Sequence, residues 1–276
     1  VVSEMCIRDS PKVAPQLARR ATMLREGRID WATAEAASLG SLLIEGVHVR
    51  LAGQDSARGT FSQRFGTIID HQTNERYIPL NHLRGQQAKI EIYNSLLSEY
   101  AAMGFEYGYS VARPDSLVLW EAQFGDFANG AQTIIDEFIA SAGTKWGQHS
   151  GVVLLLPHGY EGQGPDHSSA RIERFLNLAS EGQLAICQPS TPANYFHLLR
   201  QHTYKNMHRP VVIATPKSML RNKAATSDPS ELVSGAWQPV LADPSITDPS
   251  AVRELILCSG KVRWELVKER TKRGLE

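Results

Sequence analysis

The sequence has little cysteine, no excess of charge of either sign and no long apolar run. Its three cysteines (Cys6, Cys187 and Cys258) lie far apart without metal-site spacing, which excludes a disulfide framework and suits a reducing compartment. The 29 Lys and Arg residues balance 29 Asp and Glu residues, so charge points neither to nucleic acid nor to an anionic membrane. No apolar run reaches the roughly 18 residues of a membrane span, and the N-terminus lacks a signal-peptide pattern. A cytoplasmic protein whose partners are metabolites and proteins is expected.

Apolar runs that alternate with amphipathic segments predict the fold. The runs at 117–120, 152–156 and 211–214 have the length and composition of buried strands. The segments between them carry helical spacing, which predicts an α/β fold with a mostly parallel sheet and helices on both faces. Three helices have predicted N-caps. Asp30 precedes a helix that reaches Glu45, Ser98 precedes a helix with Phe105 and Tyr109 at the spacing of an apolar face, and Thr191 precedes a helix at 194–202.

Composition divides the chain into three parts. Residues 1–28 form an N-terminal extension, whose first ten residues have no periodicity and could be foreign sequence or a frayed terminus. Residues 29–225 form the main α/β domain. Residues 226–276 begin with a linker rich in Ser, Asp and Pro and continue into a strand at 253–259 and a basic helix. The chain reads as a piece of a longer protein.

The run at 152–156 opens into a loop that carries most of the titratable side chains of interest. Pro157 ends the strand, three glycines let the backbone bend, and Ser168 and Ser169 are predicted to cap the next helix. The titratable residues of the loop are His158, Glu161, Asp166 and His167. A dinucleotide fingerprint is disfavoured because His167 replaces its last glycine, and a metal site lacks helical i, i+4 spacing. Two interpretations of the loop remain open. Its histidines could only form hydrogen bonds with the backbone, or one histidine could face a cleft and titrate there.

Other candidate residues follow other predicted strands. Gln54 lies in a turn after the strand at 47–51, and Glu99 lies in the first turn of the helix capped by Ser98. Phe124 and Phe127 follow the strand at 117–120. Each has an ordinary alternative: a solvent turn, an acid that suits the helix dipole, or core aromatics. Chemistry in parallel sheets collects at the carboxyl ends of strands, so all four are candidates.

Several long segments, in one order, carry a resemblance to a known family. They are VRLAGQDSARGTF at 49–61, VLWEAQFGDFANGAQ at 118–132, the loop at 155–171 and TPKSMLRNKAA at 215–225. Together they resemble the thiamine-diphosphate-dependent decarboxylase component of 2-oxoglutarate dehydrogenase, closest to the actinobacterial type, from about Trp31 to the C-terminal end. The resemblance implies a transketolase-like pyrimidine-binding domain at 29–225. At 226–276 it implies a linker and the truncated start of a second α/β domain, the C-terminal transketolase-like domain. It implies decarboxylation of 2-oxoglutarate and succinyl transfer to a lipoyl group.

The resemblance also assigns roles to the candidate residues. Glu99 would be the carboxylate that activates the cofactor through its pyrimidine ring, and His167 a proton donor near the thiazole and the substrate. Phe127 would form an apolar wall for the ring beside Phe124, Gln54 would lie at the pocket edge, and His158 is a further catalytic candidate. For Glu99 to share a proton, its pKa must rise toward neutral, and burial achieves this against the helix N-terminus only if the residue is deeply buried.

Cofactors and partners follow from the same resemblance. Thiamine diphosphate and magnesium are expected, with the magnesium ligands on a separate diphosphate-binding domain of the same or a second subunit. A homodimer, a lipoyl-bearing succinyltransferase and 2-oxoglutarate are the expected partners, and the chain alone is expected to be inactive. Phe65 stands where relatives generally carry a histidine, which leaves open how this segment handles substrate. The alternatives are another thiamine-dependent enzyme, such as pyruvate dehydrogenase or transketolase, and a non-catalytic structural fragment.

Overall fold

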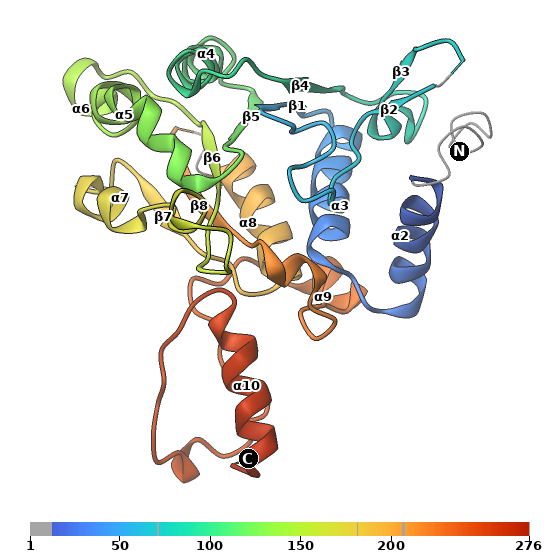
Figure 1. Ribbon diagram of the computed structural model, residues 1–276, viewed down its shortest axis with the longest axis vertical. Coiled ribbons are helices and arrows are strands. Elements are labelled where there is room, and N and C mark those ends of the chain that lie inside the picture. Colours follow the sequence, from blue (N-terminus) through green and yellow to red (C-terminus); the bar gives the residue numbers. More distant parts are fainter. Residues whose placement is uncertain (1–12, 71, 181, 206–207, 276) are drawn as a thin grey trace.

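A computed structural model describes residues 13–70, 72–180, 182–205 and 208–275 (Figure 1). The first ten residues, predicted as foreign or frayed, lie outside this description. Within it, six parallel strands form one sheet in the order β4-β1-β5-β6-β8-β7, which confirms the predicted fold class. The strands are β1 (His48–Gly53), β4 (Ile90–Asn94), β5 (Ser116–Glu121), β6 (Val153–Pro157), β7 (Ala185–Cys187) and β8 (Val211–Thr215). A small antiparallel hairpin, β2 (Ile68–Ile69) and β3 (Arg76–Tyr77), lies beside it.

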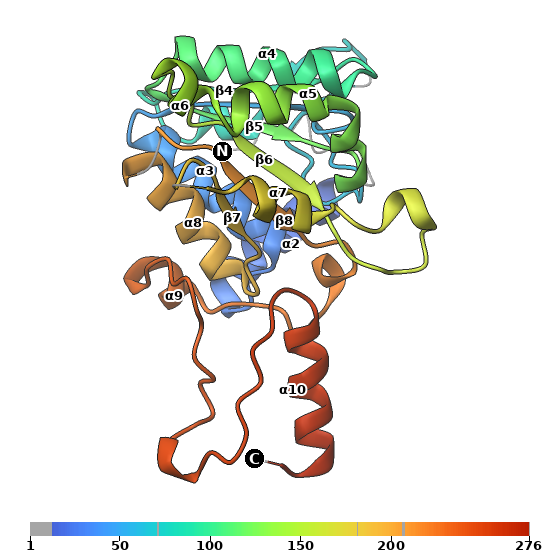
Figure 2. The ribbon, with the colours of Figure 1, turned by 90° about the vertical axis from the view of Figure 1, so that its left-hand side faces the viewer.

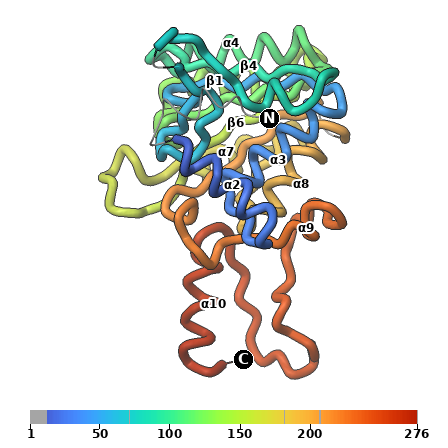
Figure 3. The backbone as a smooth tube through the Cα atoms, turned by 90° about the vertical axis from the view of Figure 1, so that its right-hand side faces the viewer, coloured from blue at the N-terminus to red at the C-terminus, as the bar shows by residue number. Residues whose placement is uncertain are grey.

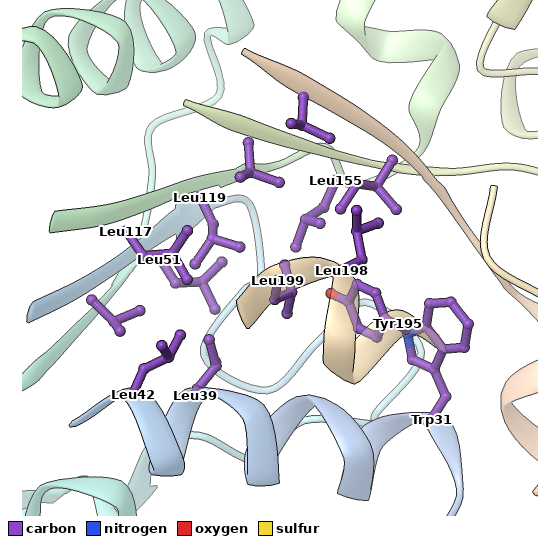
Figure 4. Close-up of a cluster of buried hydrophobic side chains, with 14 of the residues drawn as sticks. Trp31, Leu39, Leu42, Leu51, Leu117, Leu119, Leu155, Tyr195, Leu198 and Leu199 are labelled. Atoms are coloured by element: carbon purple, nitrogen blue, oxygen red, sulfur yellow. The ribbon is translucent and has the colours of Figure 1, made fainter. Parts of the chain in front are cut away.

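Helices cover both faces of the sheet, as Figure 2 shows. On one face lie α3 (Trp31–Ile44) and α8 (Pro192–Lys205); on the other lie α4 (Glu99–Ala112), α5 (Gln132–Ile134) and α7 (Ile172–Leu178). Successive strand side chains point to opposite faces, so Leu119 packs with α3 and α8 while Trp120 packs with α4 and α5. In Figure 4, Trp31 stacks on Tyr195, with ring centroids 4.2 Å apart.

Three predicted helix caps are confirmed. The Asp30 carboxylate accepts a hydrogen bond from the Thr33 N–H at 2.9 Å at the start of α3. Ser98 accepts from the Ala101 N–H at 3.3 Å at the start of α4. Thr191 accepts from the Asn194 N–H at 3.2 Å at the start of α8. These contacts satisfy backbone donors that a helix leaves without partners, and so set where each helix begins.

The apolar face predicted for α4 is only partly buried: Tyr109 is half-buried and packs against the core, but Phe105 does not. Phe105 is 60% exposed, whereas the buried side chains are Met103, Glu106, Tyr107 and Ser110. Arg50 on β1 is the reason: its guanidinium donates to the Glu106 carboxylate at 2.7 and 2.9 Å, which makes burial of that acid favourable. The same Arg50 guanidinium lies over the Phe105 ring, with its Cζ 5.1 Å from the ring centroid. Phe105 therefore makes a partly solvated cation–π contact.

Two further local predictions are wrong. The α7 helix begins after Arg171 without a side-chain cap, because the Ser168 hydroxyl donates to the Gly164 carbonyl and Ser169 accepts from the Arg171 N–H. Residues 253–259 form no strand in the described part of the chain, and Leu257 is 80% exposed. A strand needs a hydrogen-bonding neighbour, and the described residues supply none there.

Four further α-helices complete the described part of the chain. They are α2 (Ala14–Glu26), α6 (Ala142–Trp146), α9 (Pro229–Ser234) and α10 (Val262–Arg273). Figures 1 and 3 show α10 and the extended segment before it projecting from the sheet domain. The start of α10 is attached to that domain, because the Trp264 indole N–H donates to the Ser190 carbonyl at 2.9 Å. Among the described residues, no helix has the length and apolar character to cross a membrane.

A buried histidine predicts that stability depends on pH. His202 on α8 is 2% exposed, and its Nε2 lies 2.8 Å from the Gly151 carbonyl; burial lowers its pKa. A folded-state pKa below the unfolded value contributes stability above about pH 6.5, and that stability is lost as the pH falls, at about 1.4 kcal/mol per unit of depression. We expect His202→Gln, whose amide can keep the Gly151 contact, to flatten the decline of the unfolding free energy between about pH 6.5 and 5.

Urea unfolding at several pH values measures this effect. His149→Gln, at an exposed position, is the matched control and should decline like the unmodified chain. Equal pH slopes for His202→Gln and the unmodified chain would contradict the prediction.

Candidate functional site

The candidate residues meet at one edge of the sheet because the strands that precede them are parallel. Gln54 follows β1, and Glu99 begins the helix after β4. Phe124 and Phe127 follow β5, and the loop with both candidate histidines follows β6 (the yellow-green loop at the right of Figure 2). Residues distant in sequence are thus brought to the same carboxyl edge.

Gln54 and Glu99 form a direct pair. The Gln54 Nε2 donates to the Glu99 Oε1 at 2.8 Å. In the described part of the chain, Oε2 of Glu99 accepts no hydrogen bond, and a Cβ added at Gly130 would lie 3.4 Å from it. The glycine therefore leaves space beside the free oxygen. Glu99 itself is half-buried, so the deep burial expected of a proton-sharing acid is not reached within these residues alone.

Aromatic rings form a second part of the site. The Phe124 and His167 rings meet edge to face with centroids 4.3 Å apart, and Phe127 lies 5.5 Å from His167. The Phe61 ring also meets the Phe124 ring edge to face, with centroids 5.6 Å apart. Sequence reasoning missed Phe61, although it is the last residue of the VRLAGQDSARGTF segment. The result is a partly exposed apolar wall with one imidazole set into it.

Close backbone approach brings Phe127 and His167 together. Gly125 opens the 3-10 turn that carries Phe127 (Gly125–Ala131), and a Cβ there would lie 2.5 Å from the Ala170 Cβ and 2.7 Å from the Pro157 carbonyl oxygen. Only glycine allows this contact without a shift of the loop. The buried Asp126 carboxylate also pairs with the Arg171 guanidinium, which ties the turn to the end of the loop.

His158 lies in different surroundings from His167. Its Nδ1 accepts a hydrogen bond from the Ala170 N–H at 3.0 Å, and burial together with the nearby Lys217 charge lowers its pKa. It lines a cavity of about 230 Å³ with Gln188 and Lys261 among other described residues, and His167 is not among those. Because the Ala170 contact uses Nδ1, Nε2 is the ring nitrogen that could still contact a ligand. The catalytic role of His158 stays a prediction.

Lys217 binds the backbone of the loop that carries His167, and sequence reasoning missed it. It is 3% exposed, its Nζ donates to the His167 carbonyl at 2.5 Å, and it lies 5.9 Å from the Phe124 ring centroid. Burial lowers the pKa of its ammonium group. The TPKSMLRNKAA segment contains this lysine, but nothing in the segment reveals that its side chain is buried under another loop.

The acids of the loop are not arranged as metal ligands. Both carboxylate oxygens of Glu161 accept from Ser218, from its N–H and its hydroxyl, each at 2.7 Å. Asp166 is exposed. No group of three or more His, Cys, Asp or Glu side chains within the described residues is placed to hold a metal ion. Glu161 is therefore a structural anchor of the loop.

Residues 27–223 match the family model described as the pyrimidine binding domain of transketolase. The chain belongs to this family. Residues 226–276 match a second model, described as the 2-oxoglutarate dehydrogenase C-terminal region. The Gln54–Glu99 pair and the aromatic wall thus lie at the carboxyl edge of a pyrimidine-binding domain.

This pyrimidine-binding chain has relatives that are much longer than it is. It is 57% identical, over 96% of its length, to the 2-oxoglutarate dehydrogenase E1/E2 component of Corynebacterium glutamicum. It is 54% identical, over 96% of its length, to the multifunctional 2-oxoglutarate metabolism enzyme of Mycolicibacterium vanbaalenii. The chain spans 22% of the length of each.

Proposed function

We propose that this chain supplies the pyrimidine-binding half of a thiamine-diphosphate site that decarboxylates 2-oxoglutarate and passes the succinyl group to a lipoyl group. The observation that carries the proposal is the Gln54–Glu99 pair. It presents a carboxylate with one bonded and one free oxygen at the carboxyl edge of a domain of the pyrimidine-binding family. We expect the enzyme to work in the cytoplasm.

The residues present suit the aminopyrimidine half of the cofactor. The free Oε2 of Glu99 can exchange a hydrogen with a ring nitrogen, and Gln54 holds the other oxygen in place. Phe124 and Phe127 offer flat apolar surface to a planar ring. When bound, the cofactor supplies a nucleophilic carbon and an electron sink for decarboxylation. This chain's part is to bind and orient it and to control a proton at Glu99.

His167 and its surroundings suit the keto-acid end of the reaction. The imidazole stands against Phe124, and its backbone is held by the buried Lys217 ammonium group. We propose His167 as proton donor or hydrogen-bond partner of the substrate. The names of both relatives support 2-oxoglutarate over pyruvate or a ketose as that substrate.

The exposed surface beside Glu99 supports a site shared with another subunit or domain. Leu96 and Leu97, just before α4, are 79% and 87% exposed, and Tyr100 is 50% exposed. Apolar side chains this exposed next to a site suggest that a partner covers them. We propose that a diphosphate-binding domain, carrying the magnesium ligands, completes the site within a homodimer, which hands succinyl to a lipoyl-bearing succinyltransferase.

Recombination tests the proposal. The chain, combined with a diphosphate-binding domain from a relative, is expected to bind thiamine diphosphate with magnesium, and Glu99→Ala is expected to weaken that binding at least about tenfold, as loss of a charge-assisted hydrogen bond does. Calorimetric titration measures both affinities. An assembly that binds no cofactor, or binds it equally well with Glu99→Ala, would support a non-catalytic structural role instead.

A further inference from the structure

A buried arginine lies directly beneath the turn that carries Gln54. Arg64 is 6% exposed, and all five of its N–H groups donate hydrogen bonds. Two go to Glu35 on α3, at 2.7 and 3.2 Å, and two to Glu121 at the end of β5, at 2.6 and 2.7 Å. The fifth goes to the Ser56 carbonyl at 2.9 Å. We call Arg64, Glu35 and Glu121 the Arg64 cluster.

The Arg64 cluster joins the segments that carry the site. The Ser56 carbonyl lies two residues after Gln54, and Glu121 lies three residues before Phe124. The loop around Arg64 is also held from outside, because the Arg20 guanidinium on α2 donates to the Arg64 carbonyl at 2.7 Å. A small displacement of the guanidinium would therefore reach both the Gln54–Glu99 pair and the aromatic wall.

The charge balance within the Arg64 cluster indicates a geometric role. Burial alone would raise the pKa of Glu35, but the Arg64 guanidinium and the Tyr195 hydroxyl hold it below its usual value. The two carboxylates in turn raise the pKa of Arg64, so the ions stay charged in the interior. Buried ion groups add little net stability compared with apolar packing, whereas a guanidinium in a bidentate fork fixes the positions of its partners.

We propose that Arg64 is a positioning residue for the Gln54–Glu99 pair and acts through the Ser56 carbonyl and Glu121. The inference rests on the function proposed above, since it assigns Arg64 to the aiming of the cofactor-facing carboxylate. Arg64 does not line the site itself: its five donors are all used inside the protein.

Arg64→Lys tests the proposal, because lysine keeps the positive charge but cannot form the bidentate hydrogen bonds of a guanidinium. Arg64→Ala would leave two buried carboxylates unpaired and could simply prevent folding. Arg50→Lys is the matched control: Arg50 also binds a buried glutamate in bidentate fashion, Glu106, two helical turns from Glu99. Arg64→Lys removes two bidentate pairs, to Glu35 and Glu121, and Arg50→Lys removes one, to Glu106, while each change keeps the positive charge.

The first measurement uses the chain without cofactor. Amide hydrogen exchange at residues 54–61 is expected to rise about tenfold or more with Arg64→Lys and to stay unchanged with Arg50→Lys. Equal exchange of this turn in both variants overturns the proposal. This readout needs no cofactor, so it stands whether or not the proposed function does.

The second measurement uses the assembly with a diphosphate-binding domain. Exchange of the thiamine C2 proton is expected to slow by roughly 10- to 100-fold with Arg64→Lys, while cofactor affinity changes by less than that factor. Arg50→Lys should exchange the C2 proton at the normal rate. A normal rate with Arg64→Lys also overturns the proposal, whereas an unmodified assembly that shows no C2 exchange counts against the proposed function alone.

Discussion

Replacement of Glu99 with glutamine is expected to abolish exchange of the C2 proton of bound thiamine diphosphate. The glutamine carbonyl can still accept the Gln54 hydrogen bond that Oε1 now accepts at 2.8 Å, so the local geometry should persist. The amide cannot take up and return a proton as the carboxylate does, and loss of an acid–base group costs roughly 10²–10⁴-fold in rate. The unfolding free energy should change by less than about 1 kcal/mol, because the side chain is only half-buried.

Proton exchange followed by NMR in the assembly with a diphosphate-binding domain measures this effect. Glu137→Gln, an exposed acid in the π-helical turn Ile135–Ile139 that follows α5, is the matched control and should leave the rate unchanged. If Glu99→Gln also exchanges at the normal rate, Glu99 is not the activating carboxylate.

Replacement of His167 with alanine is expected to leave the cofactor bound and to lower turnover of 2-oxoglutarate by roughly 10²–10⁴-fold. The loop itself should stay in place, because Lys217 holds it through the backbone carbonyl of residue 167, which alanine retains. The imidazole also packs edge to face against Phe124, so part of any loss could come from the aromatic wall.

His167→Phe separates these two contributions. It keeps a ring against Phe124 and removes both ring nitrogens, so a loss equal to that of alanine assigns the effect to proton transfer. Steady-state turnover and cofactor titration of the two variants are the measurements. Full activity of either variant would remove His167 from the chemistry, and recovery with phenylalanine alone would make it a packing residue.

Local signals predicted much of this domain correctly. Apolar runs predicted the buried strands, and the capping residues Asp30, Ser98 and Thr191 predicted the starts of three helices. Both features depend on neighbours within a few residues, so the sequence reveals them. The parallel sheet follows from the alternation of strands and helices, and it already implies that the strand ends meet at one edge.

Predictions failed where a partner lies far away in the chain. The buried face of α4 depends on Arg50, and the missing strand at 253–259 depends on a neighbour that the described residues do not provide.

The sequence by itself determined the fold class, the strand ends that carry the site and the residue types offered there. Only the tertiary structure decided that Gln54 bonds Glu99, that His158 and His167 have separate surroundings, and that Arg64 and Lys217 are buried beneath the site. The physical reason is that strand and helix formation depends on short-range spacing, whereas burial of a charge depends on a counter-charge or carbonyl brought close by the fold, such as Glu121 for Arg64, 57 positions away.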